Sequence, residues 1–118
     1  MPFEQLKIWQ KGMALAKLLH KCTMNFPKDE VYGLKSQMRK AAVSIPSNIA
    51  EGSQRSSDKD FRNFILIAKG SLAELRTQVL LAGEFQYLTL QQREELLLNI
   101  EELNKMIFAF SRKLIAVR

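Results

Sequence analysis

The stretch "AAVSIPSNIAEGSQR", residues 41 to 55, decides how many helices the chain forms. Pro46 lies in the middle of a segment whose other residues are compatible with a helix. A proline inside a helix removes a backbone hydrogen bond and favours a break, so the segment is either a linker between two elements or one helix that contains a proline. The spacing of the apolar residues separates these two interpretations.

The apolar periodicity continues through Pro46 without a change of phase. At about 100° per residue, the apolar and small residues between positions 32 and 54 stay within one arc of about 100°. These residues are Leu34, Met38, Ala41, Ala42, Ile45, Ile49 and Gly52. A linker would shift the register, so the sequence predicts one helix over residues 32 to 54, kinked at Pro46.

A different face of this helix carries mostly short polar side chains. They are Ser36, Gln37, Lys40, Ser44, Ser47, Asn48, Glu51 and, just past the helix end, Arg55. Exposed helix faces more often carry long charged residues, whereas serine and asparagine allow another surface to approach closely. Two interpretations stay open: a contact with RNA, DNA or another chain, and local compensation for Pro46 together with capping of the helix end.

Three further segments have helical periodicity. They span about residues 4 to 24, 58 to 85 and 90 to 117. Ser57 is a predicted N-cap, and Thr89 and Gln92 have the spacing of a capping box. Five glycines and three prolines in 118 residues also favour helices. We therefore predict a single all-α domain over residues 1 to 118, an up-down-up-down four-helix bundle.

Two further ridges run along the third predicted helix, each with a spacing of seven residues. The apolar ridge is Leu66, Ala73 and Leu80; the basic ridge is Arg62, Lys69 and Arg76, and Arg55 continues its interval into the preceding connection. A second apolar ridge is hard to bury within a small monomeric bundle, so it predicts subunit association. The basic ridge is either an anion-binding surface or a set of ion-pair partners for a neighbouring helix.

Basic residues outnumber acidic ones by 18 to 12, which gives a net charge of +6. Residues 1 to 50 hold eight basic and three acidic side chains and so carry most of this excess. The asymmetry indicates an anionic partner, with nucleic acid ahead of an acidic protein or a membrane surface, although solubility alone also explains a net charge. Lys35, Arg39 and Lys40 lie in this basic half, and we favour them over the basic ridge as phosphate contacts.

Signatures of catalysis are almost absent. His20 is the only histidine, and the chain contains neither a P-loop nor a dinucleotide-binding glycine motif. Ser36 and Ser44 each lie four residues from Lys40, a spacing that a serine–lysine pair would need but that helices often produce by chance. Cys22 is the only cysteine, and no run of 18 apolar residues occurs. We expect a cytoplasmic protein that is not an enzyme and has no membrane span, metal or cofactor.

Three quoted segments carry a resemblance to a known family. They are "LKIWQKGMALA" at 6 to 16, "YGLKSQMRKAAVSIPSNIAEGSQR" at 32 to 55 and "FILIAKGSLAELRTQ" at 64 to 78. They resemble the bacterial four-helix-bundle proteins often encoded by intervening sequences within large-subunit ribosomal RNA genes. That family is similar to the accessory variability determinant proteins of diversity-generating retroelements, which form homopentamers, bind nucleic acid and partner a reverse transcriptase. The resemblance implies a basic pentameric ring.

The function expected from the sequence is non-catalytic binding of RNA or DNA by a homo-oligomer, through phosphate contacts with little base readout. Most aromatic residues are assigned to helix cores, with Trp9 and Tyr32 as exceptions that could stack on a base. The alternative is a protein-binding scaffold, or an accessory subunit of a partner enzyme such as a reverse transcriptase. Salt separates the two, because phosphate binding weakens steeply with ionic strength and a packed protein interface weakens much less.

Overall fold

The chain forms four α-helices, and the described part contains no strand. The computed structural model describes residues 2–116. A short 3₁₀ turn, η1 (Phe3–Gln5), precedes α1 (Lys7–Cys22), α2 (Leu34–Ser53), α3 (Asp58–Glu84) and α4 (Leu90–Ala116). The predicted all-α fold is confirmed, and each helix end predicted within the described residues agrees with the observed one to within three residues. The predicted end at Val117 lies outside the described residues.

Pro46 lies inside α2, which continues as one helix on both sides of it. The prediction of a single helix over this segment is therefore confirmed, while the bend at Pro46 stays a prediction. The proline side chain is buried and faces Gly12 of α1, where an added Cβ would lie 3.5 Å from both Cβ and Cδ of Pro46. The ring thus fills space between α1 and α2.

Side chains cap the two longest helices at their N-termini, as the sequence predicts. The backbone N–H of Asp60 donates to Oγ of Ser57 over 3.1 Å. At the start of α4, the N–H of Thr89 donates to Oε1 of Gln92 over 3.0 Å and the N–H of Gln92 donates to Oγ1 of Thr89 over 3.1 Å. This reciprocal pair is a capping box, and it satisfies two backbone donors that the first turn of a helix leaves without partners.

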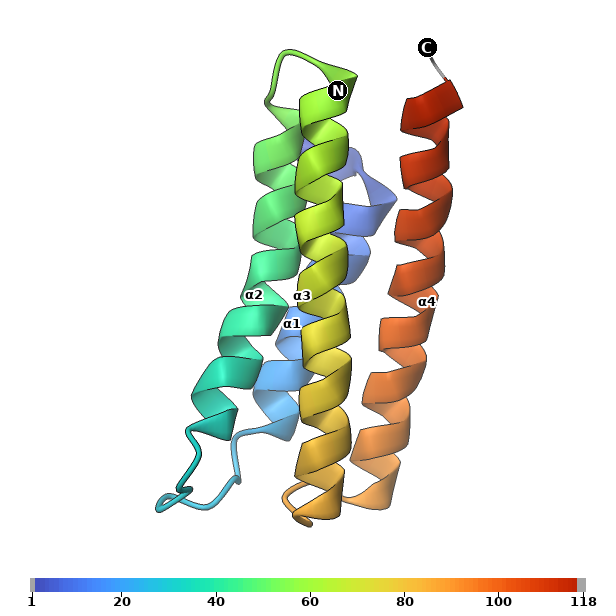
Figure 1. The fold of residues 1–118 in the computed structure, drawn as a ribbon. Helices are drawn as coiled ribbons and strands as arrows, with labels where there is room; N and C mark the ends of the chain where they lie inside the picture. Colours follow the sequence, from blue (N-terminus) through green and yellow to red (C-terminus); the bar gives the residue numbers. More distant parts are fainter. Residues whose placement is uncertain (1, 117–118) are drawn as a thin grey trace.

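The four helices stand at the corners of a square. Contacts join α1 to α2, α2 to α3, α3 to α4 and α4 to α1, and among the described residues the Cα atoms of diagonal helices do not come within 8 Å of each other. In Figure 1 the α1–α2 and α3–α4 connections lie at the lower end of the molecule and the α2–α3 connection lies at the upper end. The α1–α2 and α3–α4 pairs therefore form opposite sides of the molecule, each with its own surface groove.

The core lies between the four helices and consists of their apolar stripes. Its largest fully buried side chains include Leu15 and Leu19 of α1, Met38 of α2, Leu72 of α3 and Leu103 of α4. These residues follow the helical period from which the core was predicted. Within residues 2–116, no helix is long and apolar enough to cross a membrane.

α2 approaches α3 closely around Gly52. A Cβ added at Gly52 would lie 2.7 Å from Cβ of Phe64, 2.9 Å from Cδ1 of Phe61 and 3.3 Å from the carbonyl oxygen of Phe61. Ser44 and Ser71, also small, bring their hydroxyl oxygens within 2.9 Å of each other across the same interface. Gly52, which faces Phe61 and Phe64, and the Ser44–Ser71 pair thus allow these two helices to lie close together.

Candidate nucleic-acid interface

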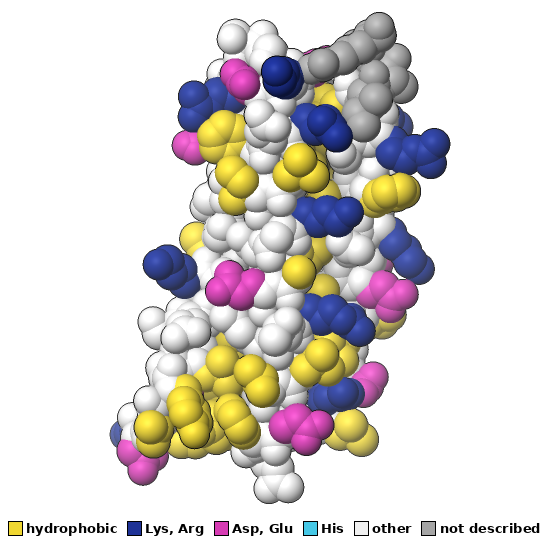
Figure 2. Space-filling view, in the orientation of Figure 1, with side chains coloured by type: hydrophobic (Ala, Val, Ile, Leu, Met, Phe, Trp, Pro, Cys, Tyr) yellow, Lys and Arg dark blue, Asp and Glu magenta, His cyan; other side chains and the backbone are white. Residues whose placement is uncertain are grey.

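The basic ridge of α3 lines an open groove between α3 and α4. Arg62 and Lys69 border a cavity of about 210 Å³, and Lys69 and Arg76 border a second of about 500 Å³ farther along the same helix pair. Figure 2 shows Lys and Arg side chains in a column down this face, with hydrophobic side chains beside them. We call this surface the α3–α4 groove, and its basic members are Arg62, Lys69 and Arg76.

Two of the three residues of the apolar ridge, Leu66 and Ala73, lie in the same groove, whereas Leu80 borders neither of its two cavities. Leu66 borders the smaller cavity and is 46% exposed, and Ala73 borders the larger one. Both ridges have a spacing of seven residues, which falls about 20° short of two full turns, so each keeps nearly one position around the helix. The groove therefore has an apolar floor flanked by cations. The sequence predicted subunit association from the apolar ridge and left anion binding or ion pairing open for the basic ridge, yet Leu66 and Ala73 share one surface with the basic ridge.

Arg62, Lys69 and Arg76 form no ion pair with another residue of the described chain. Glu101 borders the larger cavity, but the ion pair found for it joins its Oε1 to Nζ of Lys105 over 3.5 Å. The sequence left open that the basic ridge pairs with acidic residues of a neighbouring helix. Within residues 2–116 that pairing is not found, so the ridge keeps its charge available for an anion.

Phe108 of α4 lies in this groove between two cations. Its ring is 54% exposed, with Nζ of Lys69 at 5.6 Å and Cζ of Arg112 at 5.9 Å from the ring centroid. Contacts of this kind at exposed sites contribute about 0.5–1 kcal/mol each. Sequence reasoning missed Phe108 and Arg112, although their spacing of four residues on one helix indicates a contact. The prediction that aromatics other than Trp9 and Tyr32 pack in helix cores is wrong for Phe108 and for Phe85, which are both exposed.

Arg39, one of the three basic residues favoured on α2, is committed to a structural contact. Its Nε donates to Oγ1 of Thr23 over 2.9 Å, and its Nη2 donates to the carbonyl oxygen of His20 over 3.1 Å. Thr23 is fully buried and closes the C-terminus of α1, where carbonyl groups lack helical partners. Arg39 therefore joins α2 to the end of α1, and its donors are occupied in part by the protein itself.

The three favoured basic residues of α2 do not form one patch. Lys35 and Arg39 border a cavity at the connection between α1 and α2, whereas Lys40 borders a different one, together with Glu74 of α3. Arg55 lies apart from all of them, with its Nη2 3.8 Å from Oε1 of Glu51 and its Cζ 4.7 Å from the centroid of the Phe64 ring. Only the α3 members of the predicted site come together along one groove.

The short polar stripe of α2 is divided between the interior and the surface. Nδ2 of Asn48 donates to the carbonyl oxygen of Ser44 over 2.8 Å and to its Oγ over 2.9 Å, and that Oγ also contacts Ser71 of α3. Ser44 and Asn48 thus serve helix packing, while Ser36 stays exposed. Among the hydrogen bonds of residues 2–116, none joins Lys40 to Ser36 or Ser44.

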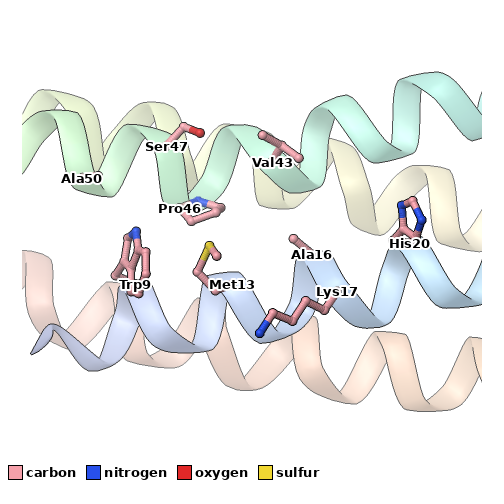
Figure 3. A pocket seen from close by; sticks show the side chains of 9 residues that line it. All are labelled: Trp9, Met13, Ala16, Lys17, His20, Val43, Pro46, Ser47 and Ala50. Carbon is pink, nitrogen blue, oxygen red and sulfur yellow. The ribbon is translucent and has the colours of Figure 1, made fainter. Parts of the chain in front are cut away.

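A second groove lies on the opposite side of the molecule, between α1 and α2. It has a volume of about 610 Å³, and most of its lining is apolar. Its lining residues are Trp9, Met13, Ala16, Lys17, His20, Val43, Pro46, Ser47 and Ala50. Figure 3 shows Met13 and Pro46 pointing toward each other between the two helices. We call this surface the α1–α2 groove; Val43 on it is 56% exposed.

Cys22 is the only cysteine, and its thiol is buried. Burial raises the pKa of the Cys22 thiol, and the nearby carboxylate of Glu95 raises it further. A raised pKa keeps the thiol protonated near neutral pH, and a protonated thiol is a poor nucleophile and metal ligand. Among residues 2–116, no three His, Cys, Asp or Glu side chains are grouped closely enough to hold a metal ion.

The fold and its surfaces define a class: a small, basic four-helix bundle with a cationic groove on one side and an apolar groove on the other. Residues 4–109 match the family model of the 23S rRNA-intervening sequence protein. The chain therefore belongs to the 23S rRNA-intervening sequence protein family.

A solved structure has the same fold. It is a protein of unknown function from the S23 ribosomal protein family of Bacteroides thetaiotaomicron, and it superposes with a TM-score of 0.79 at 24% sequence identity. The match covers 88% of this chain and 97% of that one. At this identity the likeness supports the fold alone. No curated protein matches the chain.

Proposed function

We propose that the protein is a non-catalytic, homo-oligomeric nucleic-acid-binding protein of the bacterial cytoplasm, a pentamer as the family resemblance implies. The observation that carries the proposal is the basic ridge of the α3–α4 groove, where Arg62, Lys69 and Arg76 recur about 10 Å apart along one helix. None of the three forms an ion pair within the described chain. Lysine and arginine side chains of this kind bind phosphates, and phosphate contacts carry little sequence information. The proposed binding is therefore largely nonspecific.

Oligomerisation would raise the affinity for nucleic acid above that of a single groove. One groove supplies few phosphate contacts, but copies arranged around a ring present several grooves to the same strand, and the later contacts form at high effective concentration.

The proposed subunit is an up-down-up-down bundle whose second helix bends at Pro46. No cofactor is required, because phosphate neutralisation needs only fixed cations.

The test is a salt titration of the wild-type protein with unrelated RNA and DNA oligonucleotides of equal length. We expect similar affinities for all sequences and a linear fall of the logarithm of the association constant with the logarithm of salt concentration. Fluorescence anisotropy of labelled oligonucleotides measures both. Binding that is absent, or that does not respond to salt, would exclude the proposal.

The alternative function is a protein-binding scaffold or an accessory subunit of a partner enzyme such as a reverse transcriptase. An exposed aromatic cluster at the lower end of the bundle supports it. Tyr32 stacks on Phe85 with ring centroids 5.7 Å apart, and the two residues are 66% and 41% exposed, next to Val31 at 85%. Exposed aromatic and apolar side chains of this kind are typical of protein interfaces. A salt-insensitive complex with a partner protein would favour this alternative.

We place the contact between subunits at the α1–α2 groove and not at the apolar ridge of α3. Burying Leu66 and Ala73 against another copy would also remove water from Lys69 and Arg76, and desolvated charges without partners are strongly unfavourable. The α1–α2 groove is mostly apolar, with Lys17 and His20 among its few polar members. A contact there leaves the α3–α4 groove open to nucleic acid.

Replacing Val43 with Glu is expected to dissociate the oligomer while each bundle stays folded. Val43 is 56% exposed within one copy, so the charge is tolerated in the monomer and is unfavourable only in an apolar contact. Light scattering at tens of micromolar, on the order of working concentrations, measures the mass. Leu98→Glu is the matched control, because Leu98 is 63% exposed and borders neither groove.

Ala73→Glu tests the apolar ridge as the competing contact. Because Ala73 lies between Lys69 and Arg76, we expect this variant to stay oligomeric and to bind nucleic acid more weakly. Dissociation of Ala73→Glu with Val43→Glu still assembled would assign the contact to the ridge instead. A wild-type protein that is monomeric under these conditions would refute the oligomer itself.

A further inference from the structure

The upper part of the α3–α4 groove has a composition that phosphate binding alone does not require. Phe108 presents more than half of its surface to solvent, although neighbouring Ile107 is fully buried in the core. The cavity beside it has a volume of about 210 Å³, below the range of about 300–1,000 Å³ that is usual for whole small-molecule ligands. Its size therefore suits one planar group and not an entire ligand.

The polar groups around Phe108 are cationic or neutral donors. Lys69 of α3 and Arg112 of α4 approach the ring, and Ser111 also borders the cavity. Nε of Arg62, which borders the same cavity, is buried and has no hydrogen-bond partner among the described residues. Buried donors in proteins are nearly always paired, so a water molecule or an anionic oxygen at this cavity would satisfy this N–H.

From this arrangement we infer that Phe108, with Arg62, Lys69 and Arg112, forms a subsite for one unpaired base and its adjacent phosphate. The inference rests on the proposed function and adds a substrate class to it: the α3–α4 groove prefers single-stranded nucleic acid to a duplex. The base stacks on Phe108, and the cations bind the phosphate next to that base.

Base stacking distinguishes this subsite from a purely electrostatic surface. In a duplex every base is already stacked and paired, so an exposed aromatic ring gains nothing from it, whereas an unpaired base exposes its whole face. Stacking of a base on an aromatic side chain is stronger than the contacts that Lys69 and Arg112 make with an exposed ring. Both cations lie near the outer limit for such contacts, so they are able to turn from the ring to a phosphate.

The experiment compares single-stranded and duplex oligonucleotides of the same length with wild type and Phe108→Ala at fixed salt. We expect Phe108→Ala to weaken single-strand binding by roughly tenfold, to change duplex binding by less than about twofold, and to leave the salt slope unchanged. Phe108→Trp should restore the preference for single strands. Leu98→Ala is the matched control, because it also removes an exposed apolar side chain of α4 but lies outside the groove.

A second arm uses the wild-type protein alone, so it does not depend on the folding of a variant. An oligonucleotide with abasic sites keeps its phosphates and loses its bases, and wild type should bind it roughly tenfold more weakly than the intact strand. Equal wild-type affinity for intact and abasic strands, or an equal loss for duplex and single strand in Phe108→Ala, would overturn the subsite and leave salt-dependent phosphate binding in place. Absence of salt-dependent binding to any oligonucleotide would instead exclude the proposed function.

Discussion

Replacing Arg62, Lys69 and Arg76 together with Gln is expected to lower the affinity for unrelated RNA and DNA on the order of 100-fold at low salt. The salt slope should shrink by about one unit for each phosphate that the variant no longer neutralises. The three side chains recur along one open groove and form no ion pair within the described chain, so their charges are available to an anion. Anisotropy titrations over a salt series measure the affinity and the slope.

The matched control removes the same charge from another surface. Lys7, Lys21 and Lys28 are exposed and border neither cavity of the α3–α4 groove. Their joint replacement with Gln changes the net charge by the same amount but leaves the α3–α4 groove intact. It should therefore weaken binding only slightly. An equal loss of affinity in both triple variants would mean that overall charge, and not the groove, attracts the nucleic acid.

The α2 set of Lys35, Arg39 and Lys40 provides the second comparison. The sequence favoured this set, but the structure divides it between two cavities and uses Arg39 to close the end of α1. We therefore expect its replacement with Gln to weaken binding less than replacement of the α3 set. A larger loss of affinity for a folded α2 variant would restore the preference based on the sequence.

Gly52→Ala is expected to destabilise the bundle by about 1–2 kcal/mol. The new Cβ would lie 2.7 Å from Cβ of Phe64, an atom next to the backbone that moves only if α2 and α3 separate. Overpacking of this kind usually destabilises by about 1–3 kcal/mol. Part of this destabilisation is offset, because alanine stabilises a helix by roughly 0.5–1 kcal/mol relative to glycine. Thermal unfolding should show a Tm lowered by roughly 5 °C or more at equal protein concentration.

Gly70→Ala is the matched control, since it makes the same chemical change in an open part of α3. Apart from its chain neighbours and the backbone of its own helix turn, no atom lies within 4 Å of the position that a Cβ on Gly70 would take. The helix preference then acts alone, and the variant should be more stable than wild type by roughly 0.5–1 kcal/mol. Effects of the same sign in Gly52→Ala and Gly70→Ala would contradict the close contact between α2 and α3.

Local signals explain why the helices were predictable from the sequence. Helix boundaries depend on residues within one or two turns, such as Ser57 at the start of α3 and the Thr89–Gln92 pair at the start of α4. The continuity of α2 through Pro46 followed from the period of its apolar residues, since a core-facing stripe keeps its phase only along one helix. Most of the buried apolar residues followed from the same periods, whereas the buried Gln78 of α3 did not.

The candidate site depends on distances that no single helix contains. The sequence placed Arg62, Lys69 and Arg76 in a line, but the position of α4 decides that Phe108 and Arg112 complete the same groove. The sequence-based prediction also took Arg39 to be free to bind an anion. In the structure, oxygen atoms at the end of α1 accept hydrogen bonds from its guanidinium group. Periodicity gives the angle of a residue around its own helix and says nothing about the neighbour at that angle.

Sequence alone was thus enough to predict the all-α class, the four helices, their core-facing stripes and the presence of a basic ridge. Each of these is set by short-range backbone geometry and by the burial of apolar side chains at the helical period. Helix packing, in contrast, determines which charged side chains stay open to an anion and which are used internally. That outcome depends on hydrogen bonds and contacts between residues far apart in the chain, and these form only after the helices have packed.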